Sequence, residues 1–141
     1  MTQQPPASFA SRGSTDAIEH GETFQPKFDA DGLIAAIVTD AATGEVLMFA
    51  WMNGDALAAS ISTRQAHFWS RSRAKLWRKG EDSGNVLMIE DMCTDCDQDA
   101  LLVRVRVSGK GVACHTGARS CFYRKLTLGA ATPAGSPLKA V

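Results

Sequence analysis

The chain has 141 residues, of which 45% are hydrophobic and 21% are charged, and this length and composition predict one soluble globular domain with its own core. Fifteen basic and fifteen acidic side chains give zero net charge at pH 7, which argues against a protein that coats nucleic acid or binds membrane surfaces through charge. No apolar run approaches the ~20 residues that a membrane span requires. We therefore expect neither nucleic acid nor a membrane as a partner.

The chain divides into an arm, a domain and a tail. Residues 1–27 are rich in Gln, Pro, Ser and Thr and have few apolar positions, so we expect a mobile N-terminal arm. Residues 129–141 have a similar character, and we expect a flexible C-terminal tail. The folded domain is expected to span residues 28–128.

The first part of this domain carries clear local signals. Residues 33–39 and 45–51 favour strands and are joined by the turn-prone segment DAATG, which predicts a β-hairpin. Asn53 is suited to cap a short helix through about residue 63. The side chains expected on the inward face of this helix are Ala56, Leu57 and Ile61.

The second part of the domain predicts strands. In the segment LLVRVRV, Val103 and Val105 alternate with Arg104 and Arg106, so one face of this strand is expected to be buried and the other wet. The expected strands cover residues 66–71, 86–90, 101–107 and 121–126. The result is an α+β domain with a largely antiparallel sheet and little helix.

A basic segment precedes a glycine-containing loop. Residues 64–79 hold six of the fifteen basic side chains, and the turn-forming sequence GEDSG follows at residues 80–84. Guanidinium and ammonium groups beside exposed backbone donors suit the phosphate oxygens of a small polyanionic ligand. The alternative is a solvated basic face. Phe68, Trp69 and Trp77 interleave with the basic residues, as in some nucleic-acid binders, but their alternation fits strand packing better.

Residues 91–121 contain all four cysteines, together with three closely spaced aspartates. Cys96, Cys114 and Cys121 can supply three thiolate ligands to zinc and leave a fourth position for water, which is the pattern of a catalytic site. With Cys93 as a fourth ligand the site would be closed and structural, although the spacing of the second pair does not fit a zinc knuckle. Disulfides are a third alternative. No signal segment is recognisable at the start of the chain, so we expect a reduced, cytoplasmic protein, which favours metal.

The aspartates of the DCDQD segment, Asp95, Asp97 and Asp99, form a second group. They resemble the opening of a calcium loop, but Ala100 and Arg106 stand where an EF-hand needs glycine and glutamate, which excludes that loop. If the segment is extended, the three carboxylates share one face and Cys96 lies on the other. Clustered carboxylates suit magnesium. The alternative is a solvated acidic turn whose side chains cap the next strand.

His115 directly follows Cys114 in the turn-like stretch GVACHTG. Imidazole titrates near neutral pH, so His115 is a candidate general base beside a zinc site.

Four segments together resemble the phosphoribosyl-AMP cyclohydrolase family of histidine biosynthesis. They are LMFAWMNGDAL, FWSRSRAKLWRKGEDSGN, DCDQDALL and ACHTGARSCF, and the resemblance spans roughly residues 33–123. It implies a hydrolase that opens the adenine ring of phosphoribosyl-AMP between N1 and C6, leaving a formimino carboxamide ribonucleotide. It also implies a homodimer. Asp82 departs from the Thr or Ser expected before the SG of the glycine-containing loop.

The resemblance also assigns roles to residues. It implies one zinc ion per subunit, shared across the dimer and held by Cys96, Cys114 and Cys121. It implies magnesium at Asp95, Asp97 and Asp99, and it makes His115 the candidate base. From the basic segment and its loop we expect the substrate contacts to be Arg71, Arg73, Lys79, Ser83 and Gly84.

Two other functions fit parts of the sequence. A non-catalytic zinc module could use the basic segment to bind a partner or nucleic acid, and it predicts four cysteine ligands and an indispensable Cys93. A zinc deaminase of nucleosides or nucleotides would attack the same adenine carbon. The signature of that group, H-x-E combined with P-C-x-x-C, is absent from this sequence.

Overall fold

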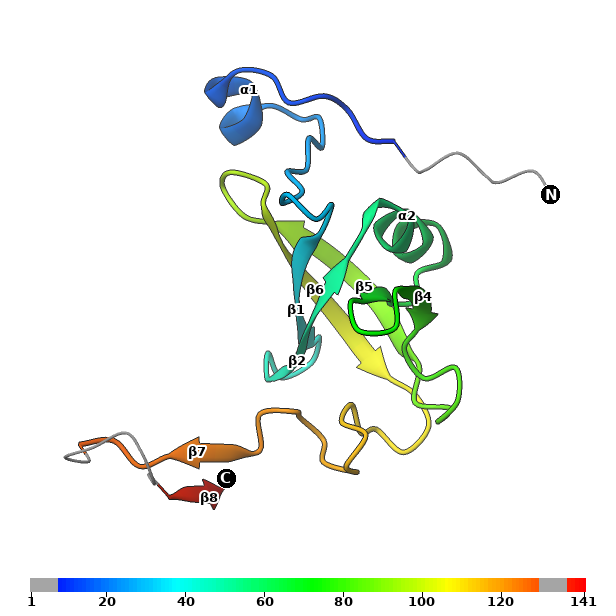
Figure 1. The fold of residues 1–141 in the computed structure, drawn as a ribbon, viewed down its shortest axis with the longest axis vertical. Coiled ribbons are helices and arrows are strands. Elements are labelled where there is room, and N and C mark those ends of the chain that lie inside the picture. Colours follow the sequence, from blue (N-terminus) through cyan, green and yellow to red (C-terminus); the bar gives the residue numbers. More distant parts are fainter. Residues whose placement is uncertain (1–7, 130–136) are drawn as a thin grey trace.

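A computed structural model describes residues 8–129 and 137–141 of the chain. Its centre is a four-stranded sheet in the order β2-β1-β6-β5, in which β1 and β6 are parallel and the other neighbours are antiparallel (Figure 1). The two shorter sheets are the pairs β3-β4 and β7-β8. The elements are α1 (Thr15–His20), β1 (Ile34–Asp40), β2 (Val46–Met52), α2 (Gly54–Thr63), β3 (His67–Ser70), β4 (Lys75–Arg78), β5 (Leu87–Thr94), β6 (Ala100–Val107), β7 (Arg124–Leu126) and β8 (Leu138–Ala140). This architecture confirms the predicted α+β class.

Local sequence signals account for the first hairpin and the long helix. β1 and β2 pair antiparallel, as predicted, and the Asp40 side chain closes their turn by accepting hydrogen bonds from the N–H groups of Ala42 and Thr43. Asn53 caps α2 as predicted, because its side-chain oxygen accepts a hydrogen bond from the N–H of Ala56 at 2.9 Å.

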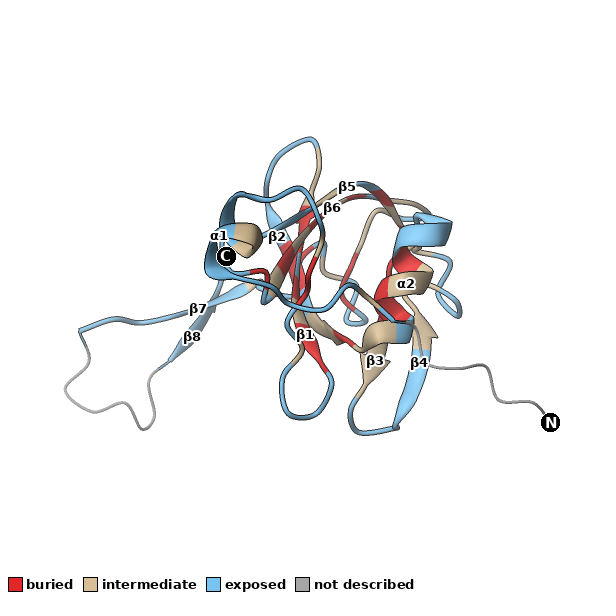
Figure 2. Ribbon diagram, turned by 90° about the horizontal axis from the view of Figure 1, so that it is seen from above, coloured by how far each residue is buried: buried red, intermediate tan, exposed pale blue. Residues whose placement is uncertain are grey.

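The core lies between one face of the large sheet and a layer made of α2 and the β3-β4 hairpin. Val103 and Val105 of β6 are fully buried, as their alternation with arginine predicts, and Phe68 of β3 is buried with them. In Figure 2 the buried parts of the sheet face the buried side of α2. The expectation for Ile61 is wrong, since 51% of this residue is exposed, and Ser60 takes the inward position instead.

Several boundaries differ from the expected ones. β5 continues to Thr94, well beyond the predicted end at residue 90, because it pairs with β6 along its length. The strand expected at 121–126 is shortened to β7, whose partner β8 falls in the stretch predicted to be a tail. Residues 130–136 of that stretch lie outside the described residues.

Residues 8–27, which we call the N-terminal segment, were expected to belong to a mobile arm, yet the structure gives them defined contacts. They include helix α1, and the rings of Phe9 and Phe24 lie edge to face with centroids 5.8 Å apart against the core. Residues 1–7 of the predicted arm lie outside the described residues.

The DCDQD segment is not extended, so the alternation considered for it does not apply. It forms the turn that joins β5 to β6, closed by hydrogen bonds from Asp95 N to Ala100 O and from Gln98 N to Asp95 O. We call residues 95–99 the acidic turn. Over residues 8–129 and 137–141, no helix has the length and apolar character needed to cross a bilayer.

Candidate active site

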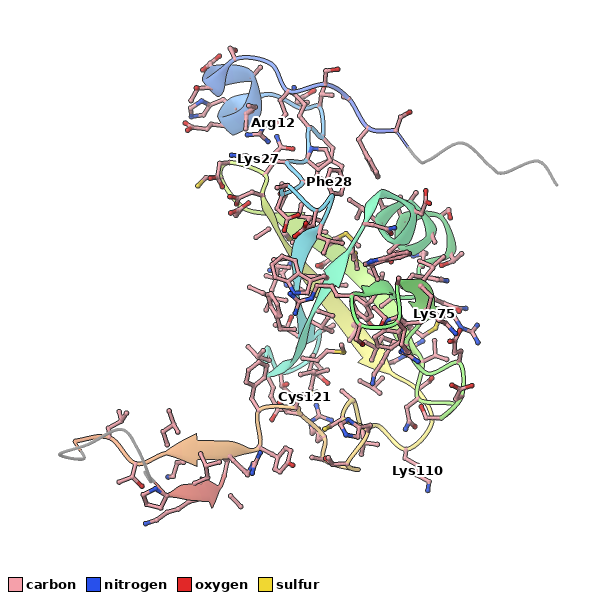
Figure 3. The ribbon with its side chains drawn as sticks, in the orientation of Figure 1. Arg12, Lys27, Phe28, Lys75, Lys110 and Cys121 are labelled. Atoms are coloured by element: carbon pink, nitrogen blue, oxygen red, sulfur yellow. The ribbon has the colours of Figure 1, made fainter. Side chains whose placement is uncertain are left out.

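A cleft of about 430 Å³ brings two regions of the predicted site together. One wall comes from β4 and the loop after it, including Lys79 and Ser83, and the other comes from the loop after β6, including Lys110, Cys114 and His115. Lys110 and Cys121 lie at the same end of the molecule in Figure 3, opposite the end that holds Arg12 and Lys27. The sequence places these two walls about thirty residues apart, and the fold joins them.

The cysteine loop, residues 113–121, is held on the β1-β2 hairpin at several points. The N–H of Cys121 donates to Leu47 O at 2.7 Å, and the Ser120 hydroxyl donates to Val46 O at the same distance. The Arg119 guanidinium contacts two carboxylates of the hairpin, with Nε 2.7 Å from Glu45 Oε1 and Nη2 2.6 Å from Asp40 Oδ2. These contacts fix the C-terminal side of the loop on the hairpin.

Within the cysteine loop a tight turn presents Cys114 to the cleft. The N–H of Gly117 donates to Cys114 O at 3.0 Å, and Gly117 has a left-handed φ of 91°, which glycine adopts without the clash of a Cβ atom. The Thr116 hydroxyl donates to the Cys114 sulfur at 3.0 Å. This turn places His115 beside the thiol, with its side chain exposed to solvent.

The two sulfurs of the loop have different acidities. The Thr116 hydroxyl and then the Thr116 N–H stabilise the Cys114 thiolate, Cys121 and Lys79 assist, and the pKa of Cys114 lies below its ordinary value. Desolvation, followed by the nearby Cys114, raises the pKa of Cys121. Cys114 is therefore the readier thiolate, and the two cysteine side chains influence each other's pKa.

Positive charge surrounds the same cleft. Arg73, Arg78, Lys79 and Lys110 line it, against only Glu81 and Asp82. The Lys79 ammonium lies 5.7 Å from the centre of the Trp77 ring. Such a cleft suits an anion with an aromatic part, because cations hold phosphate oxygens and Trp77 offers a flat surface.

Asn85 and Lys110 also line the cleft and were not among the predicted contacts. The Asn85 side-chain oxygen accepts a hydrogen bond from the N–H of Lys110 at 2.9 Å. A Cβ atom at Gly109 would stand only 2.4 Å from that oxygen, so glycine is required for this approach. The available signal was the SGKG sequence at 108–111, a turn that carries a lysine.

The other predicted contacts lie elsewhere. The Arg71 guanidinium lies over the Trp51 ring, 5.4 Å from its centre, and does not line the cleft. Gly84 is close by without lining it, since its N–H donates to Gly80 O at 2.8 Å.

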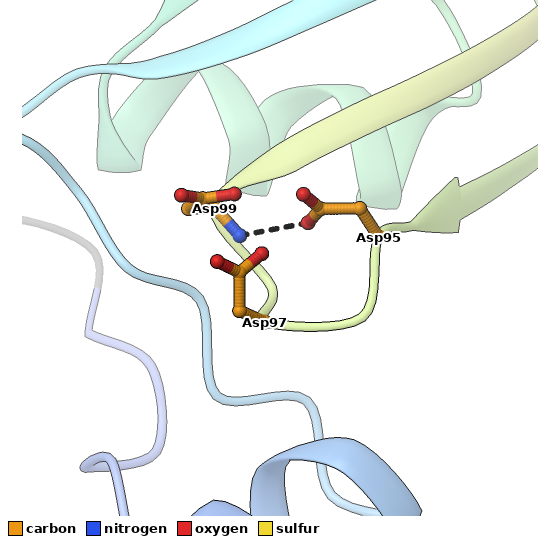
Figure 4. Close-up of side chains that lie close together, drawn as sticks. All are labelled: Asp95, Asp97 and Asp99. Carbon is orange, nitrogen blue, oxygen red and sulfur yellow. Dashed lines mark hydrogen bonds between the residues drawn. The ribbon is translucent and has the colours of Figure 1, made fainter.

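The acidic turn brings the three aspartates together at the opposite end of the sheet (Figure 4). One ligand oxygen from each of Asp95, Asp97 and Asp99 lies within 4.8 Å of the others. Asp95 Oδ1 accepts hydrogen bonds from the N–H groups of Asp99 at 2.9 Å and Ala100 at 3.0 Å. The carboxylates therefore converge through a turn, and not through the strand alternation that an extended segment would give.

The electrostatics of the acidic turn reflect this crowding. Hydrogen bonds with Asp95 and Asp97, then desolvation and repulsion, raise the pKa of Asp99 to about 6. For Asp95, desolvation acts upward, but hydrogen bonds from the Asp99 side chain and from two backbone N–H groups outweigh it, and the pKa is lowered. A cation bound among three such carboxylates would remove their mutual repulsion.

Cys96 sits in the acidic turn and lines a separate cavity with Asp95 and the N-terminal segment. β6 separates this turn from the cysteine loop, and a strand of that length spans more than about 20 Å. The described residues bring three possible metal ligands together only at the aspartates. Cys93 is exposed on β5 and accepts a hydrogen bond from Arg104 Nη1 at 3.3 Å.

The chain is similar to known proteins of one family. The family model for phosphoribosyl-AMP cyclohydrolase matches residues 48–123, which include the cleft, the acidic turn and the cysteine loop. A phosphoribosyl-AMP cyclohydrolase from Chelativorans sp. (strain BNC1) is 59% identical over 110 residues, covering 78% of this chain and 79% of that protein. The one from Brucella anthropi is 60% identical over 110 residues, covering 78% of this chain and 78% of that protein. The one from Brucella canis is 58% identical over 110 residues, covering 78% of this chain and 79% of that protein. With this match across most of both chains, the protein belongs to the phosphoribosyl-AMP cyclohydrolase family of hydrolases.

Proposed function

We propose that this chain catalyses the zinc-dependent opening of the adenine ring of 1-(5-phosphoribosyl)-AMP, a step of histidine biosynthesis. Water adds to C6, the N1–C6 bond breaks, and C6 becomes the carboxamide carbon while N1 keeps the phosphoribosyl group in a formimino link. The observation that carries the proposal is the cleft that joins Cys114 and His115 to Lys79, Arg73 and Lys110. Such a cleft offers a nucleophile-activating centre and phosphate contacts together.

The thiol chemistry fits zinc. Cys114 and Cys121 influence each other's pKa, and the lowered pKa of Cys114 favours the thiolate form that binds metal. When bound, zinc supplies Lewis-acid chemistry that makes water nucleophilic near neutral pH. The third ligand, Cys96, lies beyond the far end of β6 in the same chain, so we propose that it comes from a second copy. All four cysteines are free of disulfides, which supports a reduced, cytoplasmic setting.

His115 is the residue we propose for proton transfer. It lines the cleft directly beside Cys114, so it can accept the proton of the attacking water and deliver one to N1 as the ring bond breaks. A positioned general base of this kind contributes roughly 100-fold to 10,000-fold in rate. Lys79, Arg73 and Lys110 would meanwhile hold the phosphate groups, with Ser83 as a hydroxyl donor in the adjoining loop.

We further propose that Asp95, Asp97 and Asp99 hold magnesium. Carboxylate oxygens are the ligands that magnesium prefers, and three of them converge here. The bound cation would offset the negative charge of the three carboxylates. Because Cys96 lies in the same turn, holding the carboxylates in place would also fix the position of Cys96.

A two-fold homodimer would complete the zinc site. The face of the large sheet opposite the core exposes Ile37 and Phe49, which are cross-strand neighbours on β1 and β2 and are 37% and 44% exposed. Burial of this apolar face against the same face of a second copy is favourable. The symmetry would also exchange Cys96 between the two subunits.

Incubation of the zinc-loaded protein with phosphoribosyl-AMP tests the proposal. Ring opening should change the ultraviolet absorbance, removal of zinc by a chelator should stop the change, and readdition should restore it. Cys93→Ser is the matched control, and it should retain both zinc and activity because Cys93 lies on β5, where it contacts Arg104 of β6. A protein that binds zinc tightly through all four cysteines and leaves the substrate intact would instead be a structural zinc module.

A further inference from the structure

Gln98 differs from the rest of the acidic turn in being buried. Only 5% of it is exposed, whereas Asp97 and Asp99 on either side are exposed. Gln98 also has a left-handed backbone conformation, with φ of 57°, which is unfavourable for any residue with a Cβ atom. Contacts outside the turn must therefore stabilise this conformation.

Three hydrogen bonds between Gln98 and the N-terminal segment supply those contacts. The N–H of Gln25 donates to Gln98 Oε1 at 2.6 Å, and Gln98 Nε2 donates to Ile18 O at 2.9 Å. The N–H of Lys27 donates to the backbone oxygen of Gln98 at 2.8 Å. Both ends of the side-chain amide and the carbonyl of Gln98 are thus bound by one segment.

The N-terminal segment is itself braced. Gln25 Oε1 accepts a hydrogen bond from Gly13 N at 2.6 Å, and Gln25 O accepts one from Arg12 Nη1 at 2.8 Å. The Phe9 ring lies 5.9 Å from that of Phe28, at the start of the domain. Figure 3 shows Arg12, Lys27 and Phe28 gathered at the end of the molecule where the acidic turn lies.

We infer that Gln98 is a positioning residue for the cation site, and that docking of the N-terminal segment on Gln98 holds the three carboxylates in their converging arrangement. Asp97 and Asp99 directly precede and follow Gln98, so any change in its backbone moves both. The inference rests on the magnesium site proposed above. Cation binding and docking of the N-terminal segment require the same conformation of the acidic turn. Docking therefore raises the affinity for the cation, and the cation favours docking by the same factor.

The first test measures the affinity of the full-length protein for magnesium by titration calorimetry, with manganese and electron paramagnetic resonance as a second probe. Gln98→Ala should weaken binding roughly 10-fold to 100-fold, as loss of a residue that supports metal ligands does. The matched control is Gln65→Ala, whose side-chain oxygen accepts from Arg78 Nη1 away from the turn, and it should bind like wild type. Asp97→Asn should lose most binding.

The second test follows trypsin cleavage after Arg12 and Lys27, first in the wild-type protein alone and then in Gln98→Ala. Saturating magnesium should slow both cuts because it favours the docked segment, and in Gln98→Ala this protection should disappear.

The outcomes separate the two proposals. If Asp97→Asn loses binding while Gln98→Ala binds like wild type, the magnesium site stands and the role of Gln98 is overturned. If Asp97→Asn binds like wild type, the magnesium assignment fails and the inference falls with it. Should Gln98→Ala not fold, tryptic cleavage of wild type decides, and cleavage rates that ignore magnesium overturn the inference.

Discussion

A mixture of two inactive variants should regain activity if the zinc site is shared between subunits. Cys96 precedes β6 and Cys114 follows it, so the strand keeps them more than about 20 Å apart within one chain. In a dimer of one Cys96→Ser chain and one Cys114→Ser chain, one site carries both lesions. The other site combines intact Cys96 from one chain with intact Cys114 and Cys121 from its partner.

Random pairing sets the size of the effect. When equal amounts of the two variants are unfolded, mixed and refolded, half of the dimers are mixed and each has one intact site, so about a quarter of wild-type activity should return. Zinc content should rise in parallel. Refolded wild type controls for recovery, and native mass spectrometry of chains with different tags confirms that mixed dimers form. If mixed dimers are present and the mixture stays inactive, all three cysteines act within one chain and the shared site is refuted.

Three further predictions concern single residues. His115→Ala should keep its zinc, measured by elemental analysis, but should lose roughly 100-fold to 10,000-fold in kcat, and near-normal turnover across the pH range would exclude His115 as the base. Without divalent cations, thermal stability should fall as pH rises from about 4 to about 6, because the folded state holds the Asp99 proton more tightly than the unfolded chain does. Magnesium should reverse that fall, and an unchanged pH profile in Asp99→Asn would contradict the assignment. Arg119→Ala removes the contacts to Glu45 and Asp40 and should weaken zinc binding roughly 10-fold in a chelator competition, whereas Arg119→Lys should lose less.

Local patterns were reliable guides to local structure. The Asn53 cap and the valine alternation of β6 each follow from a few neighbouring residues, and both are confirmed. The parallel pairing of β1 with β6 was not predictable, since it joins Ala35 to Ala100 and no periodicity reports such a distant partner.

In the candidate site, too, local features were predictable from the sequence and contacts between distant segments were not. Clustering of Asp95, Asp97 and Asp99 was expected, but alternation along a strand and a tight turn both bring such residues together, and sequence spacing does not distinguish them. Lys110 was missed because its membership of the cleft depends on how two distant loops meet. The contacts of the N-terminal segment were not predicted, because its polar composition conceals aromatic anchors such as Phe9.

The parallel pairing of β1 with β6 also affects the stage of folding at which zinc is best added. This contact closes a long loop and is therefore slow to form, and the cysteine loop obtains its anchors from the β1-β2 hairpin, at Leu47 and through Arg119. Before the sheet forms, the four cysteines belong to a flexible chain that can bind zinc in non-native combinations. Zinc bound to the unfolded chain reduces the stabilisation that zinc gives to the folded state. Zinc supplied after refolding should give more active protein than zinc present throughout.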